Sequence, residues 1–238
     1  MQMAASRRKS PFRIAIDGPA GAGKSTLAEA LAHDLSFTHI NTGVIYRALS
    51  FTLIGWVGGF KNFDLLSSLL GREDPEIYAE VERFSPEIAG DEVFLKQENV
   101  TLHLRTPEID SVVGIIAKYP GVRKKIGELQ RKLINTHSVP GVVVEGRDIG
   151  TVIIPDAELK IFLIASVHVR AQRRAQENQT NNVQEIEKEM EERDRLDRTR
   201  ETSPLVQAPD AIVIDNSALS IASTIATIKA IVARRWAE

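Results

Sequence analysis

IAIDGPAGAGKSTLAE, residues 14–29, is the stretch of sequence that decides the fold. It begins with the apolar residues of a buried strand, continues through a glycine-rich turn and enters an amphipathic helix. The eight residues GPAGAGKS, from Gly18 to Ser25, fit the phosphate-binding pattern G-x-x-x-x-G-K-[ST] at every fixed position. A glycine-rich turn that carries a lysine by coincidence is the alternative. The strand before the loop and the helix after it favour a nucleoside triphosphate site.

The chemistry of phosphate binding requires these residue types at this spacing. Glycine lets the backbone approach the phosphate oxygens closely, where a Cβ would clash or forbid the dihedral angles. The loop N–H groups and the positive end of the helix then face the anion. Lys24 is expected to reach the β- and γ-phosphates, and the Ser25 hydroxyl to bind Mg²⁺. The predicted nucleotide-binding residues are Gly18, Pro19, Ala20, Gly21, Ala22, Gly23, Lys24, Ser25 and Thr26.

The composition and charge of the chain limit the partners, the metal sites and the cellular location that we expect. The chain has 238 residues, 30 basic and 32 acidic, with a net charge of −2, which gives no reason to expect a nucleic acid or an anionic membrane as partner. There are no cysteines, so disulfides and thiolate metal sites are excluded. No apolar run approaches the length of a membrane span, and the basic start MQMAASRRKSPF lacks the apolar core of a signal peptide. We therefore expect a cytoplasmic protein.

Alternating apolar runs and helical patterns predict an α/β fold with a mainly parallel sheet flanked by helices. The ligands of such a sheet are expected beyond the carboxyl ends of its strands. The predicted strands are Arg13–Ile16, about 37–40, Val142–Val144, Lys160–Ile164 and Ala211–Ile214, and the predicted helices are Ser25–Leu35, Ile109–Ile116, Val122–Thr136 and about Ile221–Trp236.

The alternation of predicted strands and helices is interrupted at residues of about 60–105. They contain Pro75 and Pro86, followed by an alternating polar and apolar run from Asp91 to Arg105. Half-buried strands alternate in this way, so the segment predicts a small antiparallel insertion.

Arginines and carboxylates cluster at several predicted loops and helix starts. Thr42 is expected to cap a helix that carries Arg47 one turn inside. Arg147 and Asp148 follow a strand at the same sheet edge as the phosphate loop, although a structural salt bridge would also explain them. An isolated arginine such as Arg47 is usually a solvated surface charge.

The run from Glu191 to Arg200 is also ambiguous. A charge run of this kind is usually a solvated helix face, and Asp194 and Arg198 have the spacing of an i,i+4 pair. Arg193, Asp197 and Arg200 fall at i, i+4 and i+7, so one helix face is expected to present two guanidiniums and a carboxylate. Two arginines on one face indicate an anionic ligand.

These motifs, in this order, resemble the bacterial cytidylate (CMP) kinase family over most of the chain. The matching stretches are DGPAGAGKST at 17–26, NTGVIYR at 41–47, LRTPEI at 104–109, YPGVR at 119–123, EGRDIGTVIIPDAELKIFL at 145–163, ERDRLDRTRETSPLVQAPDA at 192–211 and DNSALSI at 215–221. The resemblance implies one P-loop nucleoside monophosphate kinase domain over 1–238. Its core is expected at 11–59 and 119–238, a monophosphate-binding insertion at about 60–118, and a helical lid at about 177–200.

The resemblance also implies residue roles, with ATP as phosphoryl donor, Mg²⁺, and CMP or dCMP as acceptor. Lys24, Arg193 and Arg200 are the expected catalytic residues. The expected acceptor-binding residues are Thr42, Arg47, Arg123, Arg147, Asp148, Arg193, Asp197 and Arg200. Among them, Arg47 and Arg147, with Arg200, are expected to hold the CMP phosphate, Arg123 and Asp148 to face the cytosine, and Arg193 and Asp197 to meet the ribose hydroxyls.

Two positions depart from the family pattern. Asn41 stands where relatives often carry Asp, and Gly114 stands where the family has a base-contacting Ser or Thr. Ser111 lies one turn away. Two rival functions remain open: a kinase for another nucleoside monophosphate such as UMP, and a nucleotide sensor without turnover. Arginines on three segments argue against a sensor, which has no second phosphate to bind. A monomer is expected.

Overall fold

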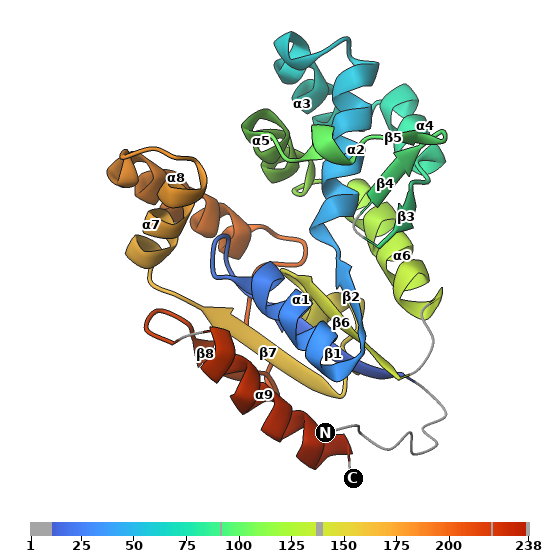
Figure 1. Cartoon of the computed structure of the whole chain (residues 1–238). Coiled ribbons are helices and arrows are strands. Elements are labelled where there is room, and N and C mark those ends of the chain that lie inside the picture. The colour runs from blue at the N-terminus through green and yellow to red at the C-terminus, as the bar shows by residue number, and fades with distance from the viewer. Residues whose placement is uncertain (1–10, 91, 137–139, 220, 237–238) are drawn as a thin grey trace. The chain divides into compact units, whose positions relative to one another are not determined.

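A computed structural model of the chain describes residues 11–90, 92–136, 140–219 and 221–236. Most of the basic N-terminal stretch discussed above lies outside these residues. The chain divides into two compact units, Met1–Ile40 with Ile134–Glu238 and Asn41–Leu133 (Figure 1). The second unit is wider on both sides than the insertion expected at about 60–118.

The first unit is built on a five-stranded sheet in the order β2-β6-β1-β7-β8. The central strand β1 pairs in parallel with β6 and β7, and β7 pairs in parallel with β8. The mainly parallel sheet predicted from the sequence is therefore confirmed. The strands are β1 (Phe12–Asp17), β2 (Thr38–Asn41), β6 (Gly141–Gly146), β7 (Leu159–Ile164) and β8 (Ile212–Asp215).

The helical elements of this unit are α1 (Lys24–Leu35), the π-helical turn η3 (Ile149–Ile153), α7 (Val167–Glu177), α8 (Val183–Thr199) and α9 (Ile221–Trp236). Leu27 and Leu31 of α1 and Ile228 of α9 share one core cluster with Ile14 and Ile161 of the sheet. The two helices thus pack together against the sheet (Figure 1). The predicted bounds of α1 and α9 are met within one residue.

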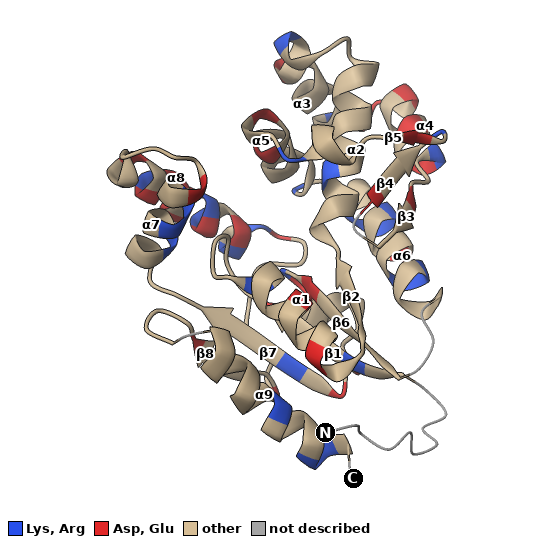
Figure 2. Cartoon of the chain, in the orientation of Figure 1, with Lys and Arg blue, Asp and Glu red and all other residues tan. Residues whose placement is uncertain are grey.

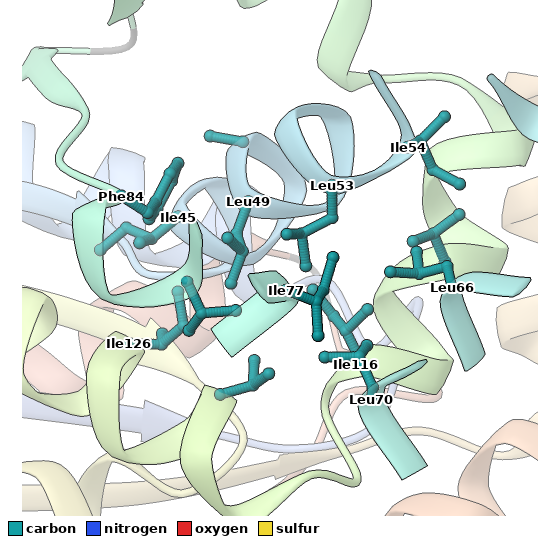
Figure 3. Close-up of a cluster of buried hydrophobic side chains, with 14 of the residues drawn as sticks. Ile45, Leu49, Leu53, Ile54, Leu66, Leu70, Ile77, Phe84, Ile116 and Ile126 are labelled. Carbon is teal, nitrogen blue, oxygen red and sulfur yellow. The ribbon is translucent and has the colours of Figure 1, made fainter. Parts of the chain in front are cut away.

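The second unit has its own core, centred on α2 (Gly43–Trp56). Ile45, Leu49 and Leu53 recur every four residues, and Figure 3 shows them beside Ile77 and Leu70 from other helices. The other helical elements are η1 (Phe60–Asn62), α3 (Phe63–Gly71), α4 (Pro75–Arg83), η2 (Thr101–Leu104), α5 (Pro107–Ile116) and α6 (Pro120–Thr136). Across the described residues no single helix is long and apolar enough to span a membrane. Gly43–Trp56 and Phe60–Gly71 pass that test only as a pair, which is bent by 87°.

A small antiparallel sheet in the order β3-β4-β5 also belongs to this unit, as the alternating run predicts. Its strands are β3 (Glu87–Ala89), β4 (Glu92–Leu95) and β5 (Glu98–Asn99). The predicted strand pattern is wrong at its end, because Thr101–Leu104 forms the 3-10 turn η2. Thr101 Oγ1 accepts a hydrogen bond from the Val93 backbone N–H, which ties this turn to β4 instead of extending the sheet.

Candidate functional site

The phosphate loop leaves β1 at Asp17 and enters α1 at Lys24. Gly21 and Gly23 have φ angles of 71° and 89°, in the region that favours glycine. Gly18 is restricted by packing as well, since a Cβ there would lie 2.0 Å from the Leu163 carbonyl oxygen. The loop therefore has the backbone that the motif predicts.

Lys24 is buried, and its Nζ donates a hydrogen bond of 2.7 Å to the Pro19 carbonyl oxygen. Burial lowers the pKa of Lys24 well below its usual value, and the positive charge of Arg147 acts in the same direction. Glu145 and Asp17 oppose this shift. An anionic ligand bound in the loop would favour the charged form of this buried lysine.

Glu145 is a residue whose role the motif analysis missed. It ends the apolar run of β6, is buried, and accepts a hydrogen bond of 2.9 Å from the Ser25 hydroxyl. Its other carboxylate oxygen lies 3.1 Å from Nε2 of His39 on β2. A hydroxyl and a carboxylate this close are oxygen ligands of the kind that Mg²⁺ prefers. The pair therefore fits an Mg²⁺ ion that is also bound by the nucleotide. The described residues contain no group of three or more His, Cys, Asp or Glu side chains that could hold a metal ion.

Asp17 fixes the loop that carries Arg147 and Asp148. Its carboxylate accepts hydrogen bonds of 2.8 and 2.7 Å from the backbone N–H groups of Ile149 and Gly150. Burial nevertheless raises the pKa of Asp17 to about 6, because desolvation outweighs the effect of the two hydrogen bonds. The phosphate loop and the Arg147 loop are thus joined at the carboxyl edge of the sheet.

Two arginines of the first unit meet on one carboxylate. Arg147 Nε lies 3.2 Å and Arg200 Nη1 lies 3.1 Å from the two oxygens of Asp197 on α8. Burial would raise the pKa of Asp197, but Arg147, Arg200 and Arg193 together outweigh it and hold that pKa below its usual value. Three predicted site arginines are therefore electrostatically coupled at this point.

Two details of the predicted α8 face are wrong. Arg200 follows the helix end in extended conformation, with ψ 141°, and reaches Asp197 from the chain beyond it, where its Nε also donates to the Ser203 carbonyl oxygen. Asp194 does not pair with Arg198, since its carboxylate binds Arg170 of α7 at 2.6 Å. Figure 2 shows basic and acidic residues interspersed along α7 and α8.

The remaining predicted site residues lie in the second unit. Arg47 Nη2 is 2.5 Å from Asp110 of α5, and its Nη1 donates to the Leu104 carbonyl oxygen at 2.9 Å. Arg123 is buried, and its guanidinium lies 5.8 Å from the centre of the Tyr46 ring, a cation–π arrangement. The partner of Arg47 was not predicted, because Asp110 is 63 positions away with no motif that links the two.

Thr42 stands at the N-cap position of α2, as predicted, but its side chain makes no capping hydrogen bond. The Asn41 side-chain oxygen instead accepts from the Gly43 backbone N–H at 3.0 Å, so the capping role expected for Thr42 is wrong. Gly114 is exposed on α5, and a Cβ there would meet no atom within 4 Å. Ser111 donates its hydroxyl to the Glu108 carbonyl oxygen.

Comparison with known proteins gives a consistent result. The family model described as cytidylate kinase matches residues 14–234. A cytidylate kinase of Oceanobacillus iheyensis is 42% identical over 213 residues, which are 88% of this chain and 88% of that protein. One of Carboxydothermus hydrogenoformans is 41% identical over 228 residues, covering 94% and 98% of the two chains.

Among solved structures, an uncharacterized protein from Eubacterium ventriosum has a similar fold. Its TM-score is 0.50 at 12% identity, with 93% of this chain and 98% of that chain covered, so the likeness shows the fold alone. The family match extends over the phosphate loop, the Arg147 loop and α8 alike. With this sequence similarity along nearly its whole length, the chain belongs to the cytidylate kinase family.

Proposed function

We propose that this protein transfers the γ-phosphoryl group of ATP to CMP, forming ADP and CDP, with dCMP as a second acceptor. The observation that carries the proposal is the pairing of Arg147 and Arg200 on Asp197, in the same unit as the phosphate loop. A triphosphate loop alone serves many enzymes and switches. Additional arginines at the same sheet edge match an enzyme that binds a second phosphate.

The phosphate loop binds the donor. Residues 18–26 surround the ATP phosphates with backbone N–H groups, and Lys24 exchanges its Pro19 carbonyl partner for β- and γ-phosphate oxygens. Ser25 and Glu145 hold the Mg²⁺ that accompanies the nucleotide. When bound, this ion neutralises part of the phosphate charge.

The residues proposed to bind the acceptor are those that the resemblance to the family implies. Arg47, Arg147 and Arg200 hold the CMP phosphate, and Arg193 and Asp197 contact the ribose hydroxyls. Thr42, at the start of α2, also contacts the acceptor. Bidentate guanidinium forks suit a phosphate dianion, so these arginines fix its orientation as well as its charge.

Phosphoryl transfer needs alignment more than it needs a base. The acceptor phosphate is already ionised near neutral pH, so an oxygen of CMP attacks the γ-phosphorus while the bond to the β-phosphate oxygen breaks. Lys24, Arg193 and Arg200 neutralise the charge spread over the transferred group. Water must be kept away from this group, since it would otherwise hydrolyse ATP without an acceptor.

Cytosine is selected by complementary hydrogen bonding. The Asp148 carboxylate accepts from the exocyclic amino group, and the Arg123 guanidinium donates to N3 and O2. Uracil presents a carbonyl to the carboxylate and an N–H to the arginine, which leaves polar groups unpaired. We expect kcat/KM for CMP to exceed that for UMP by at least about 100-fold, or about 2.8 kcal/mol, since two buried polar groups are left unpaired and each costs about 1–3 kcal/mol.

A coupled assay of ADP formation with CMP, dCMP, UMP and AMP tests the proposal. CMP should be the best acceptor, and Lys24→Ala should abolish turnover while the circular dichroism spectrum stays unchanged. Equal rates with UMP and CMP would overturn the base assignment. A monophosphate kinase should also gain thermal stability from CMP alone, whereas a triphosphate sensor should gain none. The monomeric state and the cytoplasmic location, without membrane or nucleic-acid partners, remain predictions.

A further inference from the structure

Arg170 of α7 is a buried arginine that none of the roles above uses. It is 4% exposed, and its guanidinium makes contacts with three different segments. Nε donates to the Ala165 carbonyl oxygen after β7, at 3.0 Å. Nη1 donates to the Ala20 carbonyl oxygen of the phosphate loop, also at 3.0 Å. Its two terminal nitrogens bind both carboxylate oxygens of Asp194 on α8, at 3.3 and 2.6 Å.

Packing places the same three elements in close contact. A Cβ on Gly21 of the phosphate loop would lie 3.1 Å from the terminal methyl carbon of Met190 and 3.3 Å from Cβ of Arg170. Met190 and Asp194 are one helical turn apart on α8, and both are buried. The face of α8 that they form is therefore seated against α7 and the phosphate loop.

We infer that Arg170 and Asp194 are a positioning pair, which fixes α8 against the phosphate loop and so holds Arg193 near Lys24 and Asp197 on Arg147. Arg193 precedes Asp194 directly, and its charge acts on both Lys24 and Asp197. Asp197 follows one turn later and binds Arg147 and Arg200. Neither member of the pair needs to touch a nucleotide. This inference rests on the proposed function only for its kinetic consequences.

The effect of a buried ion pair on stability can be measured separately from its effect on the position of α8. Removing one partner leaves an uncompensated buried charge, which destabilises the fold strongly, whereas apolar residues of similar volume at both positions are often tolerated. An apolar pair cannot bind the Ala20 carbonyl or orient α8 through a planar fork. Stability and catalysis should therefore respond differently to the double replacement.

The experiment compares Arg170→Met, Asp194→Leu and the double variant with the wild type. Each single variant should lower Tm, and the double variant should have a higher Tm than the less stable single variant. Its kcat should nevertheless stay at least tenfold below that of the wild type, with ADP formed in excess of CDP, because misplaced lid arginines no longer keep water from the γ-phosphate. Arg195→Met, which removes the exposed pair with Glu192 on the same helix, is the control and should leave kcat and the ADP to CDP ratio unchanged.

Hydrogen exchange of residues 190–199 without nucleotide gives a second readout, independent of activity. Exchange should be faster in the double variant than in the wild type and unchanged in Arg195→Met. A double variant with wild-type kcat, or with wild-type exchange in 190–199, would overturn the inference. If the wild type forms no CDP, the proposed function fails, and the exchange comparison alone decides on the positioning pair.

Discussion

Asp110 is the carboxylate that Arg47 contacts. If Arg47 binds the CMP phosphate, a fixed negative charge beside it opposes a dianionic ligand. Asp110→Asn removes this charge and keeps the side-chain shape. We expect the KM for CMP to fall about threefold to tenfold, which corresponds to about 1 kcal/mol for a partly exposed pair. Steady-state kinetics with saturating ATP measure the change.

Glu108→Gln on the same helix is a matched control, because Glu108 is exposed and its neutralisation should leave KM unchanged. A higher KM in Asp110→Asn would show the reverse role, in which the carboxylate orients Arg47 for the phosphate.

Gly114 is an exposed glycine inside α5, where a Cβ meets open space. Gly114→Ala should therefore raise the free energy of unfolding by about 0.5–1 kcal/mol, because alanine loses less backbone entropy in a helix. Urea unfolding followed by circular dichroism measures this gain. Gly18→Ala should have the opposite effect, because its Cβ would collide with the Leu163 carbonyl oxygen. No gain in the first variant would mean that α5 contributes little to the measured transition.

Whether a contact between two residues could be predicted from the sequence depends on how far apart the residues lie along the chain. The phosphate-loop glycines lie within one motif, so their conformation could be predicted from their spacing. Glu145 and Asp17 act through partners 120 and 132 residues away, and nothing in a single sequence connects such pairs. Asp194 shows the risk of local reasoning. An i+4 arginine was available, but the buried Arg170 offers two hydrogen bonds in a drier environment.

The π-helical turn η3 depends on Asp17, and this dependence should be visible as a function of pH. Because burial raises the pKa of Asp17 from 3.8 to about 6, the folded protein binds a proton between these values that the unfolded chain has lost. Stability should fall as pH rises through this interval, by up to about 3 kcal/mol, and level off above about pH 7. Unfolding free energies of the wild type relative to Asp17→Asn isolate this effect. A wild type that becomes more stable relative to Asp17→Asn as pH rises would contradict the prediction.

The helix α8 should not behave as one mobile element. Residues 178–185 are almost entirely exposed, whereas Ile186, Met190 and Asp194 are buried. Amide hydrogen exchange should therefore be faster before residue 186 than after residue 190 in the free protein, and analogues of ATP and CMP together should slow it in the first segment. Uniform protection from 178 to 199 would contradict this. The sequence predicted a helix here correctly, but its i, i+4, i+7 argument extended the helix to Arg200, which lies outside it.

At the scale of the whole molecule, the two units have separate cores. Each unit contains one tryptophan, Trp236 in the first and Trp56 in the second. Leu49→Ala opens a cavity in the second core and should cost about 2–5 kcal/mol there. The unfolding midpoint reported by Trp56, measured in a Trp236→Phe background, should therefore fall more than the midpoint reported by Trp236 in a Trp56→Phe background. Equal shifts would show that the two cores unfold as one.

The parallel fold class could be predicted because apolar runs and helical patterns alternate along the first unit. The extent of the second unit could not. Its start at Asn41 and its end at Leu133 fall at the end of a predicted strand and inside a predicted helix. Only the packing of α2 and α6 into the second core marks these boundaries, because their local sequence pattern is that of any core helix.

The position of β1 in the middle of its sheet has a consequence for synthesis on the ribosome. Its first residue, Phe12, pairs with Gly141 and stacks on Trp236 at 5.3 Å, so β1 cannot complete its contacts before α9 has emerged. The second unit is contiguous from Asn41 to Leu133 and can be complete while the first is still unfinished. In the nascent chain, the second unit should therefore become resistant to proteases before the nucleotide site forms.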